Sequence, residues 1–146
     1  MTGIDSANML KVIEDFPHQC QTALELAKGI TVSGKVDKII IAGMGGSAVG
    51  GDLLRLYMHD SRIPVMTIRD YKLPNFVDEN TLVFAVSYSG NTEETLSAFE
   101  DAAKKKAKIV AVTSGGQLAE KAKKVIKIPS GLQPRAALGY LFFPVL

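Results

Sequence analysis

The sequence has 146 residues, a length typical of one domain, and 47% of them are hydrophobic while 22% are charged. That balance is too apolar for a disordered chain. The formal net charge is only +2, with 17 basic residues against 15 acidic ones, which argues against a nucleic acid or an anionic membrane as partner.

The first third of the chain predicts helices followed by a buried strand. Apolar residues recur at helical spacing through Phe16, and a second helical stretch covers residues 17–28. The pattern then changes, because residues 36–42 contain the run Ile39-Ile40-Ile41. A continuous β-branched run of this kind is typical of a strand that is buried on both faces of a parallel sheet.

Strands and helices alternate along the rest of the chain. We predict strands at residues 63–68, 81–86, 108–112 and 125–128, and helices at residues 48–58, 93–106 and 117–123. Such alternation favours a parallel sheet with right-handed crossovers and helices on both faces. The predicted fold class is therefore α/β, a three-layer α/β/α sandwich around a five-stranded parallel sheet.

Residues 138–146 form an apolar stretch that would be costly to leave exposed. A second domain could cover it, a partner subunit could pack there, or the stretch could fold back onto its own core. Elsewhere, no segment approaches the roughly 20 apolar residues of a membrane span, and residues 1–10 lack the features of an export signal. The single cysteine, Cys20, excludes an internal disulfide and suits a reducing cytoplasm, where we expect the protein to work without a membrane partner.

The loop after the first strand is rich in glycine. In open parallel α/β sheets, ligands bind beyond the carboxyl ends of the strands, where loops lead into helix N-termini. Gly43, Gly45 and Gly46 allow close approach to an anion, and Ser47 adds a hydroxyl donor. The same loop also fits a dinucleotide-binding pattern, with Asp70 near the spacing of a ribose-binding acid, so an NAD site is an alternative.

The loop after the third strand carries three hydroxyls, on Ser87, Ser89 and Thr92, with Gly90 between them. Together with the amides of the following helix, these neutral donors could surround a phosphate. The alternative is that Ser89 or Asn91 only caps the helix. Two carboxylates in its first turn, Glu93 and Glu94, would repel a phosphate, so they must point away or have a separate task.

Three further groups of residues need an assignment. The loop Thr113-Ser114-Gly115-Gly116 is a less specific hydroxyl and glycine turn that could touch the same ligand. Arg135 lies among apolar neighbours, so it either pairs with a carboxylate or faces an anionic ligand, and we favour the ligand. His18 and His59 fall on predicted helices away from the strand ends and are interpreted as surface or packing residues. We expect no metal.

These motifs together resemble the sugar isomerase (SIS) domain, and more narrowly the bifunctional phosphoglucose/phosphomannose isomerases of archaea and some bacteria. Nearly the whole chain takes part, and four segments carry the resemblance: Gly43 to Asp52, Ser87 to Thr95, Thr113 to Gly116 and Pro134 to Tyr140. It implies a flavodoxin-like fold with no cofactor. It also implies that the phosphate of glucose 6-phosphate or mannose 6-phosphate contacts Gly46, Ser47, Ser87, Ser89 and Thr92, and that Arg135 assists the step between C1 and C2.

The resemblance also predicts the domain organisation. Members of the family carry two SIS domains in tandem, work as homodimers, and place their catalytic glutamate, histidine and lysine in the second half, which this sequence lacks. Residues 1–146 would then be one SIS domain, with a helical segment at 1–35, the parallel core at 36–130 and the start of a connection at 131–146. Two rival functions remain: a non-catalytic module that senses sugar phosphates, and an NAD-binding domain.

Overall fold

The computed structural model describes residues 4–146, so the first three residues of the stretch tested for an export signal lie outside it. Its five strands form one parallel sheet in the order β2-β1-β3-β4-β5. They are β1 (Lys38–Gly43), β2 (Val65–Ile68), β3 (Thr81–Val86), β4 (Lys108–Thr113) and β5 (Val125–Lys127). This is the flavodoxin-like order, and it confirms the predicted α/β class.

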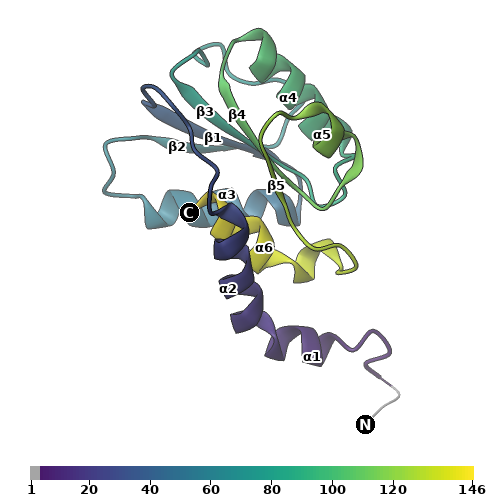
Figure 1. Cartoon of the computed structure of the whole chain (residues 1–146). Helices are drawn as coiled ribbons and strands as arrows, with labels where there is room; N and C mark the ends of the chain where they lie inside the picture. The colour runs from purple at the N-terminus through teal and green to yellow at the C-terminus, as the bar shows by residue number, and fades with distance from the viewer. Residues whose placement is uncertain (1–3) are drawn as a thin grey trace.

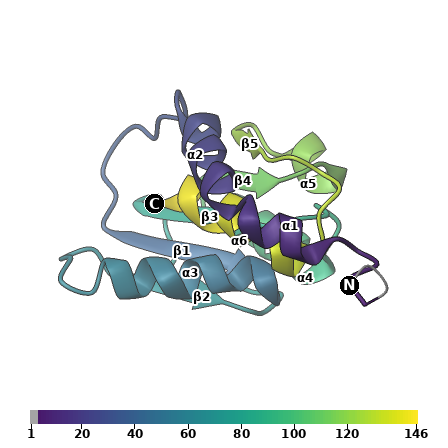
Figure 2. The same cartoon turned by 90° about the horizontal axis from the view of Figure 1, so that it is seen from below.

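Helices cover both faces of the sheet, as Figure 1 shows, with α4 and α5 on one face and α2, α3 and α6 on the other. The helices are α1 (Met9–Glu14), α2 (Phe16–Ala27), α3 (Gly46–Tyr57), α4 (Glu93–Lys104), α5 (Gly116–Lys121) and α6 (Leu138–Phe142), with 3₁₀ turns η1 (Pro134–Ala136) and η2 (Phe143–Val145). In the view from below, α2 and α6 lie next to each other (Figure 2). None of the helices within residues 4–146 is long and apolar enough to cross a membrane.

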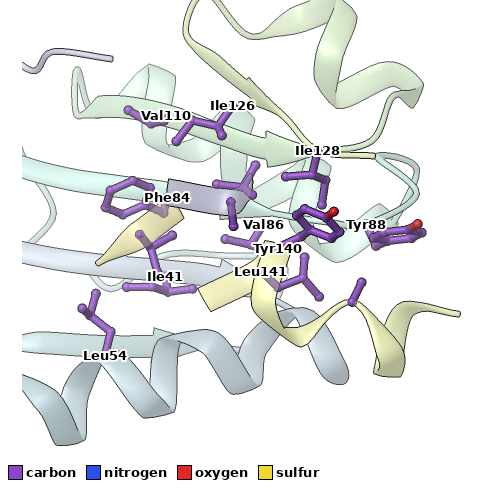
Figure 3. Close-up of a cluster of buried hydrophobic side chains, with 14 of the residues drawn as sticks. Ile41, Leu54, Phe84, Val86, Tyr88, Val110, Ile126, Ile128, Tyr140 and Leu141 are labelled. Atoms are coloured by element: carbon purple, nitrogen blue, oxygen red, sulfur yellow. The ribbon is translucent and has the colours of Figure 1, made fainter. Parts of the chain in front are cut away.

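The core follows from the alternation of side chains along the buried strands. Ile41 and Phe84 pack on the face covered by α2, α3 and α6, whereas Ile40 and Val83 pack against α4 on the other face. Figure 3 shows the first of these clusters, in which Leu54 of α3 approaches Ile41. All six residues of β3 are buried, as the continuous apolar run at residues 81–86 predicted.

The apolar stretch at residues 138–146 folds back onto its own domain. Leu141 is fully buried, and Tyr140 and Val145 are less than one tenth exposed, within the cluster that α2 and α3 share. Of the three expectations for this stretch, packing on its own core is therefore the one that the structure shows. The connection to a second domain stays a prediction.

Candidate functional site

Three loops meet at the carboxyl edge of the sheet because β1, β3 and β4 are neighbours in parallel register. Gly43 at the end of β1 pairs with Val86 at the end of β3, and Val86 pairs in turn with Val112 of β4. The residues that follow each strand therefore emerge side by side, at the edge where parallel α/β sheets bind ligands.

The first loop is fastened to the second by close backbone contact. A Cβ on Gly43 would lie 2.8 Å from the carbonyl oxygen of Val86, so only glycine fits there. Gly45 precedes α3 with φ of +52° and supplies no side-chain cap. Ser47 is 7% exposed, and its hydroxyl oxygen accepts the Tyr88 amide at 3.3 Å. The N-terminus of α3 thus faces the start of the second loop.

The hydroxyls of the second loop form a connected set. The oxygen of Ser87 accepts the Gly90 amide at 3.1 Å and lies 2.9 Å from the hydroxyl oxygen of Thr92. Ser89 accepts the Asn91 amide at 3.2 Å. Exposure differs along the loop, since Ser87 is buried, Thr92 is half-buried and Ser89 is exposed. An incoming ligand would therefore meet Ser89 and Thr92 first.

Neither Ser89 nor Asn91 caps α4, so the alternative of simple helix capping is wrong. The N-cap of α4 is Thr92, which makes no capping hydrogen bond with its side chain. The side-chain oxygen of Asn91 instead accepts the Gln117 amide at 3.0 Å, in the first turn of α5. The first amides of α4 have no acceptors within the helix, as at any helix start, and they carry the positive end of the helix dipole.

The third loop supports the second one. Ser114 donates to the Tyr88 carbonyl from both its amide, at 3.0 Å, and its hydroxyl, at 2.7 Å. The Thr113 hydroxyl donates to the Gly115 carbonyl at 2.8 Å. Because these hydroxyl hydrogens already have acceptors, the third loop holds the second in place and has fewer donors to offer to a ligand.

Arg135 lies beside the first loop. A Cβ on Gly46 would be 3.5 Å from the Pro134 carbonyl oxygen and 3.6 Å from the Cα of Arg135, so η1 packs directly on the start of α3. The Arg135 side chain is exposed and forms no ion pair with any carboxylate of residues 4–146. The alternative of pairing with a carboxylate is therefore not found within these residues.

The acidic pair in the first turn of α4, Glu93 and Glu94, acts electrostatically on the loop that follows β2. The negative charge of Glu94, followed by burial and by the charge of Glu93, raises the pKa of Tyr71 in that loop. The expectation that the two carboxylates point away from a phosphate stays a prediction. The two histidines are exposed, and His59 contacts Asp60 beyond the end of α3. Within residues 4–146 no three metal-ligating side chains gather.

The dinucleotide alternative receives less support from the topology. In the dinucleotide-binding fold the first strand lies between the second and the fourth, whereas here β1 lies between β2 and β3. Asp70 does follow β2, but its carboxylate accepts the amide of Tyr71 at 2.6 Å.

Two residues at this edge have contacts that the sequence pattern did not indicate. The hydroxyl of Tyr88 donates to the Pro129 carbonyl at 3.0 Å and accepts the Leu132 amide at 2.9 Å, which ties the second loop to the segment before η1. Gln19 of α2 is 3% exposed, and its side chain forms hydrogen bonds with the backbone of Ala136 and Gly139, which follow Arg135. No local signal marks Gln19, since its partners lie 117 and 120 residues away.

Comparisons with known proteins show the family of this chain. The family model of the SIS domain matches residues 34–141. The bifunctional phosphoglucose/phosphomannose isomerase of Caldicellulosiruptor bescii is 56% identical over 94% of this chain, which spans 43% of that protein. The D-glucosamine-6-phosphate 4-epimerase of Sulfolobus acidocaldarius is 40% identical over 73% of the chain and is covered over 35% of its own length. The chain thus spans less than half the length of these curated relatives.

Solved structures show the same fold at low sequence identity. A phosphoheptose isomerase from Francisella tularensis superimposes with a TM-score of 0.62 at 19% identity, covering 99% of this chain and 95% of that one. At that identity the likeness concerns the fold alone.

Proposed function

This chain belongs to the SIS domain family, and we propose that it is the sugar-phosphate-binding N-terminal SIS domain of an aldose–ketose isomerase. The proposed reaction interconverts glucose 6-phosphate, and also mannose 6-phosphate, with fructose 6-phosphate. The name and the 56% identity of the Caldicellulosiruptor bescii relative support this choice. The observation that carries it is the set of hydroxyls where β1 and β3 end.

Three of these hydroxyl oxygens each accept a hydrogen bond from a backbone amide. Tyr88, Gly90 and Asn91 donate their amides to Ser47, Ser87 and Ser89 respectively. Each hydroxyl keeps its own hydrogen for another acceptor. Hydroxyls that each accept one amide and still have a hydrogen to donate suit a ligand that only accepts, such as a phosphate dianion.

We call Gly46, Ser47, Ser87, Ser89 and Thr92 the phosphate nest. In this proposal Ser89 and Thr92 contact the phosphate directly, because they are the accessible hydroxyls. Ser87 is only 1% exposed, so it acts through its contact with Thr92. Gly46 and Ser47 add the N-terminus of α3, whose dipole favours a negative charge.

Arg135 is the proposed catalytic cation. Aldose to ketose conversion opens the sugar ring, removes a proton from C2 and returns it to C1, with negative charge on an enediolate between the two transfers. A fixed guanidinium beside the nest would stabilise that charge, while the phosphate, which does not react, holds the sugar in position. The proton-transferring glutamate, histidine and lysine are proposed to lie in a second SIS domain. The present chain alone should then bind substrate without converting it.

The same nest would also serve an epimerase, and the Sulfolobus acidocaldarius relative favours this as a second candidate. Its name specifies a phosphate on position 6 of a hexosamine, with chemistry at C4. The phosphate nest cannot distinguish these sugars, since it contacts only the group that they share. Product analysis separates the two: the isomerase yields a ketose, whereas the epimerase yields another aldose. A non-catalytic sensor would yield neither, even as the intact protein.

A homodimer of the intact protein, in the cytoplasm, is also proposed. Three large apolar side chains of α3 are exposed in this chain: Val49 at 39%, Leu56 at 63% and Tyr57 at 70%. Such a face is suited to a subunit interface. The molar mass of the intact protein in solution, measured with Leu56→Asp as comparison, tests this assignment.

Replacement of Ser89 tests the proposed function most simply. Ser89→Ala removes a donor to the phosphate and should weaken glucose 6-phosphate binding by about 1.5–3 kcal/mol, the range for a hydrogen bond to a charged group. Ser61→Ala is a matched control, because Ser61 is also exposed and its hydroxyl likewise accepts an amide two residues on, at 3.1 Å. Equal affinity of both variants would refute the phosphate nest.

A further inference from the structure

Gln19 uses both ends of its side-chain amide on one short segment. Its Nε2 donates to the Ala136 carbonyl at 3.1 Å, and its Oε1 accepts the Gly139 amide at 2.6 Å. The residue is 3% exposed on α2, so these two backbone groups, rather than water, satisfy the hydrogen-bonding capacity of its amide. The two bonds bracket the junction between η1 and α6, directly after Arg135.

The segment leaves room for this amide at a specific place. A Cβ on Gly139 would lie 2.6 Å from the Oε1 of Gln19, so a larger residue there would displace the side chain. Gly46 of the phosphate nest packs against the backbone of Pro134 and Arg135. The start of α3 therefore contacts the backbone at Arg135, and the Gln19 amide holds the backbone that follows it.

We propose that Gln19 is the positioning residue for Arg135: its two hydrogen bonds fix the segment so that the guanidinium is presented to the phosphate nest. This inference rests on the proposed function, since it assumes that Arg135 acts on the bound sugar. Besides the packing of its backbone on the start of α3, η1 has little else to fix it, because none of its residues is buried. The α6 side, by contrast, is anchored by the fully buried Ala137 and Leu141.

That difference predicts what the loss of Gln19 would do. The buried side chains keep α6 on the core without the glutamine, whereas η1 loses its only side-chain hydrogen bond from α2 within the described residues. The protein should fold while Arg135 samples several positions. Misplacement of a catalytic group by about 1 Å can cost on the order of 10²-fold in rate.

The test compares Gln19→Met with Arg135→Met and with the double variant, in the intact enzyme. If Gln19 acts through Arg135, Gln19→Met should lower kcat by roughly 10-fold or more, with KM little changed, because the phosphate nest is intact. In the Arg135→Met background the same replacement should change kcat by less than about twofold, because the arginine that Gln19 positions is already gone. Twofold is about the error within which the effects of independent replacements add. Gln21→Met, on the exposed face of the same helix, is the matched control.

A fully additive effect of the two replacements, or a normal kcat in Gln19→Met, would overturn the positioning role. A normal kcat in Arg135→Met would instead contradict the proposed function, so the two failures are distinguishable. If Gln19→Met folds poorly, Gly139→Ala takes its place in the test. The added carbon displaces the Gln19 amide, so kcat should fall in the same way.

A readout without activity completes the test. In ¹⁵N relaxation experiments on this chain, the amides of Arg135 and Ala136 should become mobile on the nanosecond timescale in Gln19→Met or Gly139→Ala, while Leu141 stays ordered. Relaxation identical to that of the unmodified chain at all three amides would overturn the proposal.

Discussion

The hydroxyl oxygens of Ser87 and Thr92 lie 2.9 Å apart, and the Gly90 amide donates to the first of them at 3.1 Å. Either hydroxyl of the pair could donate to the other. When Ser87 donates to Thr92, the hydrogen of Thr92 is left for a ligand that accepts. Hydrogen bonds in such a chain polarise and strengthen one another. In that arrangement the buried serine would act on a ligand through the half-exposed threonine.

Replacement of Thr92 tests this chain of donors. Thr92→Val keeps the shape but removes the last hydroxyl, and should weaken glucose 6-phosphate binding by about 1.5–3 kcal/mol, while Thr92→Ser should retain most of the affinity. Isothermal titration calorimetry measures both. Thr95→Val is the control, because that buried hydroxyl has no partner within the described residues and its loss should not weaken binding. The relay is contradicted if Thr92→Val and Thr92→Ser bind equally well.

Gly90 should tolerate no side chain. Its φ is +72°, and a Cβ there would overlap the Gly115 carbonyl oxygen and lie 2.7 Å from the Thr113 hydroxyl. Gly90→Ala should therefore lower the free energy of unfolding by about 3 kcal/mol or more, as strain and overlap add. Gly115→Ala, where nothing lies within 4 Å of the added carbon, should stay close to the unmodified chain. Similar urea midpoints for the two variants would show that the loops are not packed as described.

Arg135 should matter more for turnover than for substrate binding. The charge that it meets develops mainly in the enediolate, so Arg135→Met in the intact enzyme should lower kcat by about 10²–10³-fold and raise KM only slightly. Arg135→Lys should restore part of the loss, because an ammonium cannot copy the guanidinium fork. Steady-state kinetics and the melting temperature of both variants provide the measurement. A lower melting temperature with normal kcat would assign Arg135 a structural role instead.

Acid should weaken the fold through an ion cluster at the amino edge of the sheet. The Nζ of Lys38 lies 2.6 Å from an Asp37 oxygen and 3.0 Å from an Asp78 oxygen. The hydrogen bond from Lys38 holds the pKa of Asp78 below its ordinary value. A carboxyl whose pKa is lower in the folded state contributes stability above its unfolded pKa of about 3.9 and loses it as the pH falls through the folded value.

Asp78→Asn removes this contribution. The variant should be less stable than the unmodified chain near neutral pH, and the difference should shrink as the pH falls below about 4. Denaturant unfolding at a series of pH values measures it, and a difference that is constant over the whole range would rule out the ion cluster as its cause.

Local sequence patterns predicted most of the sheet. The predicted strand at residues 81–86 has the same bounds as β3. A short apolar run between polar loops is typical of a strand that is buried on both faces of a parallel sheet. The predicted strand at residues 63–68 begins two residues later, at Val65, since Pro64 has no amide to donate to the sheet. The flavodoxin-like strand order came from the family resemblance, because no local pattern determines which strands are neighbours.

The candidate site was predictable to the extent that it depends on strand ends. The hydroxyls after β1 and β3 could be placed together because parallel strands end at the same edge. The contact between Gly46 and Arg135 was not indicated by spacing, and neither was Gln19, whose partners lie 117 and 120 residues away. The sequence also did not determine what covers residues 138–146, since the hydrophobic effect is non-directional and any apolar surface could bury them.

The phosphate nest is the central claim, and amide chemical shifts test it most directly. In a ¹⁵N-labelled sample of this chain, glucose 6-phosphate should shift the amides of Gly46, Ser47, Ser89 and Thr92 in a saturable manner, whereas glucose at the same concentrations should leave them unchanged. Ser61 and the other amides at the opposite edge should not respond to either. The account is contradicted if glucose reproduces the shifts, or if the sugar phosphate moves amides elsewhere and leaves these four in place.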